Sequence, residues 1–373
     1  MYSGIAIYSL IWIASSLIVF FCYKKSIGFH NPNGSIEHRS KMPIPAALLI
    51  SLLFTLFNVY ATVNSVAMGG DRQNYMGNFL GYRASPSIGL TFLMNWTHVL
   101  GGSLESLFYF TTFSCTFITL MAYRMSKKTD PLAFSLLCMT QYFLTTLTAL
   151  KQSYTSAFAV VFLVLILEYN SKKSNAAALV CALLACLFHS TGYILIVLFI
   201  VVRIVRATKN VNIYLLFLFI VAIFFKRIIL IAAIVIQPVL PSLAHTITAY
   251  FGPGGISETT GSSTAWIFGM PYYYITILGI IKNKDLEKKI PGYDEHLFIV
   301  GIGAFFLLMS TYSEWLARFV YLFSFSSMIF FSELMKTIQI EATKKTYTYL
   351  LAAMLLIFTY RFLYLIYTLY GGF

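Results

Sequence analysis

Residues 4–25 read GIAIYSLIWIASSLIVFFCYKK, and they indicate the fold class of the chain. Residues 4–23 carry no charge, and Lys24 and Lys25 follow at once. A helix rises about 1.5 Å per residue, so about 20 apolar residues cross the roughly 30 Å of hydrocarbon in a bilayer. The stretch therefore predicts a transmembrane helix. No basic region precedes it, which favours a permanent first span over a cleaved signal peptide.

The rest of the chain repeats this pattern. Hydrophobic residues make up 59% of the sequence and charged residues 10%, whereas soluble domains carry about 25% charged residues. We therefore expect an all-α integral membrane protein, with residues 1–373 forming a single polytopic transmembrane domain of about twelve membrane-spanning helices. The expected spans are 4–23, 44–67, 103–123, 131–149, 153–169, 176–190, 191–205, 211–229, 264–281, 296–312, 316–335 and 346–369.

Three segments depart from the simple pattern. The apolar stretch near 86–100 is too short to cross a bilayer, so we expect it to be re-entrant or to lie along the interface. The segment near 237–263 forms a long outer loop, and such loops are typically functional or mobile. Residues 176–205 are too long for one span and are interrupted around His189, which indicates two short helices that meet at the outer face.

The cations fix the expected orientation. Most of the 26 Lys and Arg residues fall in one set of alternate loops, and such loops stay on the cytoplasmic side during insertion. We therefore expect both termini on the outer side. The net charge of +13 mainly reflects this bias and gives no reason to expect nucleic acid as a partner. The loops assigned to the inner side lie near 24–41, 124–128, 172–173, 203–209, 282–289 and 336–345.

The metal-binding residue types show no metal-type spacing. The five cysteines fall within predicted spans, as small buried hydrophobic residues do. No two of the six histidines have HxxxH spacing, and no carboxylates form a DxD pair. Because divalent metals need several such ligands close together, we expect neither a metal ion nor a cofactor.

The remaining cations lie on the predicted outer side or within spans. A charge in or near hydrocarbon costs at least a few kcal/mol, so it usually faces a wet cavity or a partner. An outer cavity with excess positive charge suits an anionic ligand. Structural explanations stay open for some of these residues: an ion pair between Arg318 and Glu314, four residues apart, an interface position for Lys226 and Arg227, and snorkelling for Arg361. The cations are Arg72, Arg83, Lys151, Lys226, Arg227, Arg318 and Arg361.

Four short motifs occur in a characteristic order. They are Asp71…Tyr75 after the second span, Lys151-Gln152 at the start of a span, Phe188-His189-Ser190, and Arg318-Phe319…Tyr321 in a late span. This order resembles the EpsG-like, Wzy-type polysaccharide polymerases of bacterial surface glycans. One departure is Lys151, because that family most often has arginine there. Lysine keeps the charge but lacks the bidentate fork of arginine.

The resemblance implies a metal-independent glycosyltransferase with a GT-C-like fold in the bacterial inner membrane. Its substrates would be oligosaccharide repeat units carried on undecaprenyl pyrophosphate, which it would join at the periplasmic face. Besides the bilayer and this lipid-linked oligosaccharide, a chain-length regulator is a candidate partner. Outer-side cations would hold the pyrophosphate and stabilise the charge that develops as the glycosidic bond breaks. The candidate substrate-binding residues are Arg72, Tyr75, Lys151, Gln152, Lys226, Arg227, Tyr250 and Arg318.

Such a transfer needs one base to take the proton of the acceptor hydroxyl. Asp71, Glu314 and His189 are the candidates. Asp71 is our first choice, because it is a carboxylate in a polar outer loop beside Arg72. Glu314 is open to pairing with Arg318, and His189 equally suits a buried, hydrogen-bonded histidine.

Two alternative functions fit parts of the pattern. A flippase for the same lipid-linked glycan would also need cations in a cavity, but the chain shows no convincing internal repeat of the kind common in transporters. A membrane O-acyltransferase acting on glycans would use His189 as its base. It would draw its donor from the cytoplasm, where the sequence offers no comparable histidine.

Overall fold

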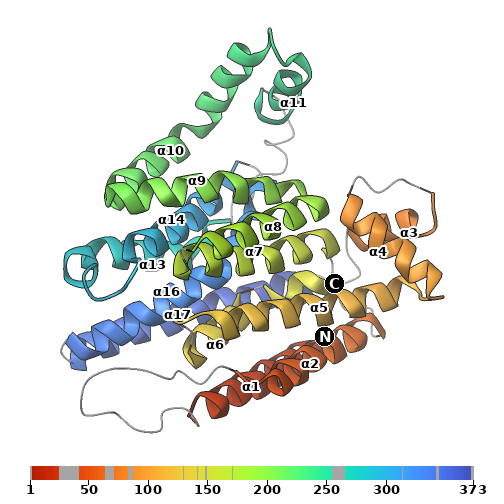
Figure 1. Cartoon of the computed structure of the whole chain (residues 1–373), viewed down its shortest axis with the longest axis horizontal. Coiled ribbons are helices and arrows are strands. Elements are labelled where there is room, and N and C mark those ends of the chain that lie inside the picture. The colour runs from red at the N-terminus through yellow and green to blue at the C-terminus, as the bar shows by residue number, and fades with distance from the viewer. Residues whose placement is uncertain are drawn as a thin grey trace. The chain divides into compact units, whose positions relative to one another are not determined.

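The computed structural model describes residues 2–24, 42–63, 71–82, 87–128, 130–140, 142–147, 149–169, 171–253, 265–312, 314–341 and 344–370. Nearly all of these residues are helical, and they include no β-strand (Figure 1). The prediction of an all-α protein is therefore confirmed.

Seven helices in the described part of the chain are long and apolar enough to cross a membrane. They make this a multi-pass membrane protein. Helices also occupy the other predicted spans, but two of these have only 17 residues, Lys172–Phe188 and Tyr293–Met309. The seven membrane-crossing candidates are Ala6–Tyr23, Ile44–Val63, Leu104–Met125, Leu150–Glu168, Ser190–Thr208, Val211–Ile236 and Lys345–Tyr364.

The chain forms two compact units. Unit 1 comprises Met1–Val201, Met328–Lys336 and Phe358–Phe373, and unit 2 comprises Val202–Ser327 and Thr337–Ile357. In unit 1 the elements are α1 (Tyr2–Lys24), α2 (Ile44–Val63), α3 (Asp71–Phe79), α4 (Ile88–Val99), α5 (Leu104–Met125), α6 (Pro131–Met139), η1 (Phe143–Leu147), α7 (Leu150–Glu168), α8 (Lys172–Phe188) and η2 (Ser190–Gly192). Unit 2 contains α10 (Val211–Ile236), α11 (Pro241–Phe251), α13 (Ala265–Leu286), α14 (Tyr293–Met309) and α15 (Glu314–Ala317). Both units include parts of α9 (Tyr193–Thr208), α16 (Val320–Glu341) and α17 (Lys344–Tyr370).

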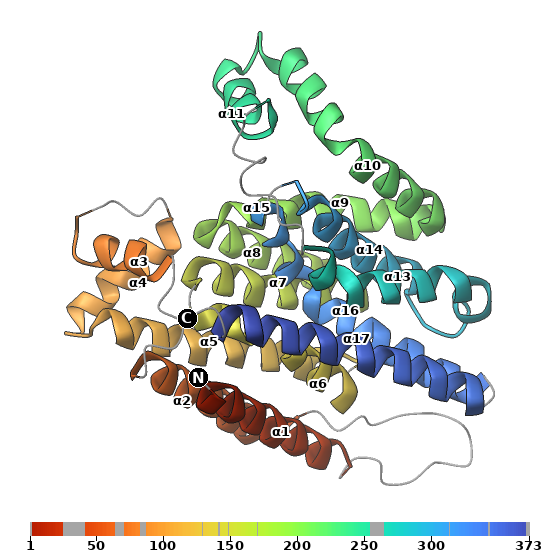
Figure 2. The same ribbon diagram turned by 180° about the vertical axis from the view of Figure 1, so that it is seen from behind.

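The core of unit 1 is built on α5 and α7. Most of α7 is buried, and it packs between α5 and the antiparallel α8. The short helices α3 and α4 lie beside the first turns of α5 (Figures 1 and 2). Tyr75 and Phe79 of α3 and Leu90 of α4 join Phe108 of α5 in one buried cluster. This cluster fixes α3 and α4 to the end of the helical bundle.

The predicted span 131–149 is not a single helix. The helix α6 ends at Met139, the 3-10 helix η1 follows, and α7 starts at Leu150. Threonine side chains explain the break, because their hydroxyls bind nearby backbone carbonyls and compete with helical bonding. Thr140 donates to the carbonyl of Leu137 at 2.7 Å, and Thr146 donates to that of Phe143 at 2.7 Å. Lys151 consequently lies in the first turn of α7, not in a loop.

Two further segments correct the expected secondary structure in detail. The stretch near 86–100 forms the twelve-residue helix α4, capped by the Ser87 hydroxyl, which accepts from the Leu90 N–H at 3.3 Å. Such a helix is too short to cross a bilayer, as expected. The predicted loop near 237–263 is partly wrong, because α11 occupies Pro241–Phe251, and residues 254–263 lie outside the described residues. Pro241 stands in its first turn, where the missing N–H of proline does no harm.

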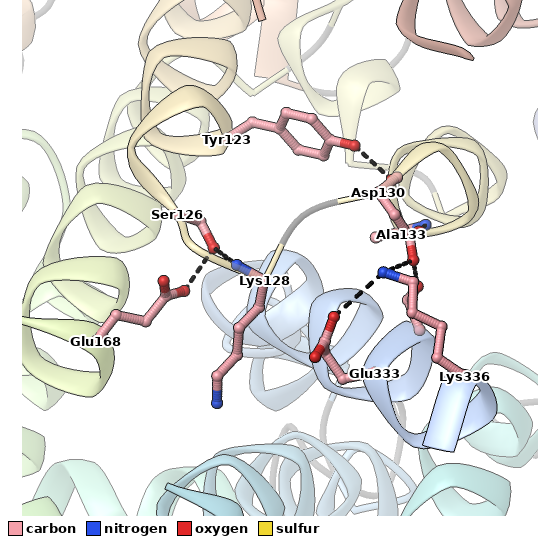
Figure 3. Close-up of polar contacts among 9 residues, drawn as sticks. Tyr123, Ser126, Lys128, Asp130, Ala133, Glu168, Glu333 and Lys336 are labelled. Atoms are coloured by element: carbon pink, nitrogen blue, oxygen red, sulfur yellow. Dashed lines mark hydrogen bonds and ion pairs between the residues drawn. The ribbon is translucent and has the colours of Figure 1, made fainter. Parts of the chain in front are cut away.

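A buried polar network joins α6 to the part of α16 that belongs to unit 1 (Figure 3). Asp130 is 3% exposed and caps α6 by accepting from the Ala133 N–H at 2.9 Å. Its other carboxylate oxygen accepts from Ser332 and lies 2.5 Å from the Lys336 ammonium. Glu333 contacts the same ammonium at 3.2 Å. The network lies at the end of unit 1 that the charge pattern assigns to the inner side.

Candidate functional site

The helix α3 brings Arg72 and Tyr75 to one face, since residues three apart in a helix are neighbours. Arg72 is 7% exposed and Tyr75 is 3% exposed, whereas Asn74 between them is exposed. The backbone of Asp71 opens α3, but its side chain lies outside the described residues. The acid-and-aromatic motif seen in the sequence therefore forms a short helix whose arginine and tyrosine point into unit 1.

The Arg72 guanidinium is buried against uncharged side chains. It lies over the Phe108 ring, 4.4 Å from its centroid, and its Nη2 donates to the Thr62 hydroxyl at 3.2 Å. No carboxylate forms an ion pair with Arg72 among the side chains that the structure describes. Burial lowers the pKa of Arg72, and the charge of Glu105 opposes that shift. The described residues provide one hydrogen-bond acceptor for this guanidinium, and an anionic ligand can accept from its other N–H groups.

A second cation lies near the Tyr75 ring, which packs against Phe108. The Lys151 ammonium is 5.8 Å from the centroid of the Tyr75 ring, and that ring meets Phe108 edge-on at 6.0 Å. The two cations thus contact the two members of one aromatic pair. Lys151 also stands in the first turn of α7, whose N-cap residue Ala149 makes no side-chain capping bond. The partial positive charge of a helix N-terminus adds to that of the lysine.

The Lys151-Gln152 and Phe188-His189-Ser190 motifs meet at Thr191. The Thr191 hydroxyl donates to the Gln152 side-chain oxygen at 3.5 Å, and the Thr191 N–H donates to His189 Nδ1 at 3.1 Å. Gln152 is 3% exposed. Because Nδ1 accepts a hydrogen bond, the neutral imidazole carries its proton on Nε2. Sequence reasoning identified both motifs but not Thr191, the residue that joins them.

The helix α4 ties the two halves of the site together. The Ser87 hydroxyl donates to the Phe188 carbonyl at 2.7 Å, immediately before His189. At the other end of α4, His98 Nε2 lies 2.8 Å from the Phe79 carbonyl, and the two rings stack at 4.0 Å. One end of α4 therefore contacts Phe188, the residue before His189, and the other end contacts α3. The sequence signal for the contacts of Ser87 was its place directly before the apolar stretch, where serine commonly caps a helix.

Some of the predicted substrate-binding residues lie in α10 and α11 of unit 2. Lys226 and Arg227 lie within α10, which continues to Ile236, so they do not mark the end of a helix. Tyr250 is in α11 and is 39% exposed. These predicted substrate-binding residues belong to unit 2.

Glu314 and Arg318 do not lie on one continuous helix, and an ion pair between them stays a prediction. The helix α15 spans only Glu314–Ala317, and Arg318 is an exposed residue in the turn before α16. Arg318 therefore lies in a turn, although the predicted span 316–335 includes it. The side chain of Glu314 lies outside the described residues.

Arg361 does not snorkel to the interface. Its side chain is 2% exposed, and Nη1 donates to the Met139 carbonyl at 3.2 Å. Met139 ends α6, where the last carbonyls of a helix lack internal partners. The helix break at Thr140 therefore supplies the acceptor, and Arg361 is a structural residue of unit 1.

The described residues contain no group of three His, Cys, Asp or Glu side chains that could hold a metal ion. The chemistry available in the described cluster is that of two cations, an amide, a hydroxyl and an imidazole. Together with the apolar helices, this cluster defines a multi-pass membrane protein with a buried cationic site.

The EpsG family model matches residues 47–371, and the chain therefore belongs to the EpsG family. The resemblance expected from the four motifs is confirmed. Membership makes this a polysaccharide polymerase-type membrane protein with glycosyltransferase-like activity. No curated protein and no solved structure matches the chain.

Proposed function

We propose that this protein joins undecaprenyl-pyrophosphate-linked oligosaccharide repeat units at the outer face of the bacterial inner membrane. The observation that carries the proposal is Arg72, a buried guanidinium for which the described residues provide one hydrogen bond and no carboxylate partner. A guanidinium in this state suits an oxyanion that can accept two parallel hydrogen bonds. Lys151, on the other member of the same aromatic pair, supplies a second positive charge.

In the proposed reaction the acceptor hydroxyl oxygen attacks the anomeric carbon of the growing chain. The bond from that carbon to the pyrophosphate oxygen breaks, and its electron pair leaves with the pyrophosphate. Arg72 and Lys151 stabilise this developing charge. Asp71 takes the hydroxyl proton, and His189 is the alternative base. The reaction needs no metal ion in this scheme, because the protein cations neutralise the leaving group.

The other predicted residues have supporting roles in this proposal. Gln152 and His189, which are both hydrogen-bonded to Thr191, bind sugar hydroxyls. Lys226, Arg227 and Arg318 add positive charge on the outer side, and Tyr250, which is partly exposed, stacks on a sugar ring. The proposal also includes a GT-C-like arrangement of about twelve spans with both termini outside, because the distribution of Lys and Arg along the chain favours that topology.

The glycan profile of a gene-deleted cell tests the proposal. A polymerase defect leaves a single repeat unit on the lipid carrier, or on lipid A in a cell that has it. Accumulation of lipid-linked units at the cytoplasmic face would instead indicate a flippase. Complementation with Arg72→Ala should fail, whereas Lys173→Ala should restore polymer, since Lys173 is an exposed residue in the first turn of α8.

A further inference from the structure

We propose that Thr62 and Asn58 of α2 are positioning residues for Arg72, an inference that rests on the proposed function. Asn58 is fully buried, and Thr62 follows it by one helical turn. The Thr62 hydroxyl accepts from Arg72 Nη2 at 3.2 Å and donates to Asn58 Oδ1 at 3.3 Å. Asn58 Nδ2 in turn donates to the Thr112 hydroxyl and to the Phe108 carbonyl.

The direction of this chain of hydrogen bonds is fixed at its far end. A threonine hydroxyl has one hydrogen and rotates freely unless a partner holds it. Here the amide group of Asn58 is held by α5, so its carbonyl oxygen faces Thr62. Thr62 must give its hydrogen to that oxygen, and its lone pairs then point toward the guanidinium. Asn58 therefore makes Thr62 an obligatory acceptor for Arg72.

This arrangement leaves Arg72 prepared for a phosphate group. The guanidinium carbon lies 4.4 Å from the centroid of the Phe108 ring, and Thr62 uses only one of the two hydrogens on Nη2. A guanidinium has two edges that can donate bidentately, so at least one stays intact. Holding that edge in place before the ligand arrives reduces the entropy lost on binding. The effect should therefore show in affinity for a pyrophosphate headgroup.

Other hydroxyl residues of α2 behave differently. Ser51 donates to the Ala47 carbonyl at 2.8 Å, and Thr55 donates to the Ser51 carbonyl at 2.8 Å, so both bind their own helix. The hydroxyl of Thr62 instead bridges two side chains, one of them the buried arginine. Thr55 is thus a matched control: the same residue type in the same helix, with its side-chain hydrogen bond confined to that helix.

The test uses the full chain in lipid nanodiscs. Thr62→Val removes the hydroxyl at nearly constant volume, and Thr62→Ser restores it. We expect Thr62→Val to weaken binding of undecaprenyl pyrophosphate about tenfold, as for loss of one hydrogen bond to a charged group, with undecaprenol binding unchanged. KM for lipid-linked repeat units should rise with it. Thr62→Ser should recover most of the affinity, and Thr55→Val should match the parent protein.

A double substitution separates positioning from general stability. If Thr62 acts through the guanidinium, Thr62→Val should add no further loss in an Arg72→Ala background. An independent tenfold loss in that background would overturn the inference, and so would parent-like affinity in Thr62→Val alone. Full polymer formation by Arg72→Ala would instead overturn the proposed function. The two failures are therefore distinguishable. Asn58→Leu should weaken binding as Thr62→Val does. The comparison of Thr62→Val with Thr62→Ser is the decisive one, because these two substitutions alter the core least.

Discussion

Replacing Asp130 by alanine removes two stabilising features at once, the N-cap of α6 and the buried ion pair with Lys336. Loss of a capping side chain costs about 1 kcal/mol. Removing one partner of a fully buried ion pair costs about 3–5 kcal/mol. The Lys336 side chain is 38% exposed and keeps Glu333 as a partner, so solvent screening reduces that second contribution to about 2 kcal/mol. We therefore expect Asp130→Ala to lower the free energy of unfolding by about 3 kcal/mol.

Related variants separate the contribution of the helix cap from that of the ion pair. Asp130→Asn keeps an oxygen for the cap and loses only the charge, so it should be destabilised by about 2 kcal/mol. The double variant Asp130→Asn, Lys336→Met should recover most of the stability lost in Asp130→Asn, because it no longer buries a charge without a counter-charge. Ser103→Ala is the control for a cap alone. The Ser103 hydroxyl caps α5 by accepting from the Ser106 N–H, and its loss should cost about 1 kcal/mol.

The measurement is thermal unfolding of purified protein in detergent, followed by the accessibility of its cysteines to a thiol-reactive dye. The melting temperature should fall in the order Ser103→Ala, Asp130→Asn, Asp130→Ala. The reasoning is refuted if Asp130→Ala melts no lower than Ser103→Ala, because the ion pair would then contribute nothing. It is equally refuted if the Asp130→Asn and Lys336→Met losses simply add.

Four further predictions concern single positions. Arg361→Ala should lower the melting temperature by several degrees, because it leaves the Met139 carbonyl without its buried donor; a snorkelling arginine would give no change. Asp294→Asn should raise the melting temperature at pH 7. Burial first, and then the charges of Glu287 and Glu295, raise the pKa of Asp294, so its ionised form destabilises the folded state. The gain should shrink as pH falls through the raised pKa of Asp294 in the folded state, and it should be gone below the usual pKa of an aspartate, about 4. A gain that grows on acidification would contradict this sign. Gly192→Ala should abolish polymer formation, because a Cβ there would lie 2.6 Å from the backbone of Ala185 and would displace the turn that contains His189. The parent protein in the same activity assay is the reference. Asp71→Asn should keep undecaprenyl pyrophosphate binding and lose turnover by 100-fold or more, roughly what a general base contributes, and near-parent turnover would pass the role of base to His189 or Glu314.

The sequence alone predicted the helices well, because an apolar run of about 20 residues has few alternatives in a membrane. It failed between 131 and 149, where hydropathy stays high but threonine hydroxyls compete for the backbone. It also treated the segment around Pro241 as a loop, although proline in a first turn is a helix-start signal. Hydropathy reports how apolar a segment is, and these two boundaries depend on local hydrogen bonding.

The candidate site was predictable residue by residue but not as a set of contacts. Lys151-Gln152 and Phe188-His189-Ser190 stood out as short motifs, yet their meeting at Thr191 depends on the pairing of α7 with α8. Asn58 was passed over because one asparagine in an apolar span gives no sign of its partner. Arg361 was misinterpreted for the opposite reason. Its place near the end of a span suggested the interface, whereas its acceptor lies 222 residues away in the sequence.

The contacts of α4 set an order of events during synthesis. Ser87 binds Phe188, 101 residues further along the chain, so α4 has no docking partner at that end when it first leaves the ribosome. At about 5–20 residues per second, α8 follows roughly 5–20 s later. Until then a helix too short to span the bilayer waits at the membrane surface with Arg72 and Tyr75 just ahead of it. A nascent chain arrested before residue 188 should therefore hold its first helices in the membrane and still lack the contact between Ser87 and Phe188.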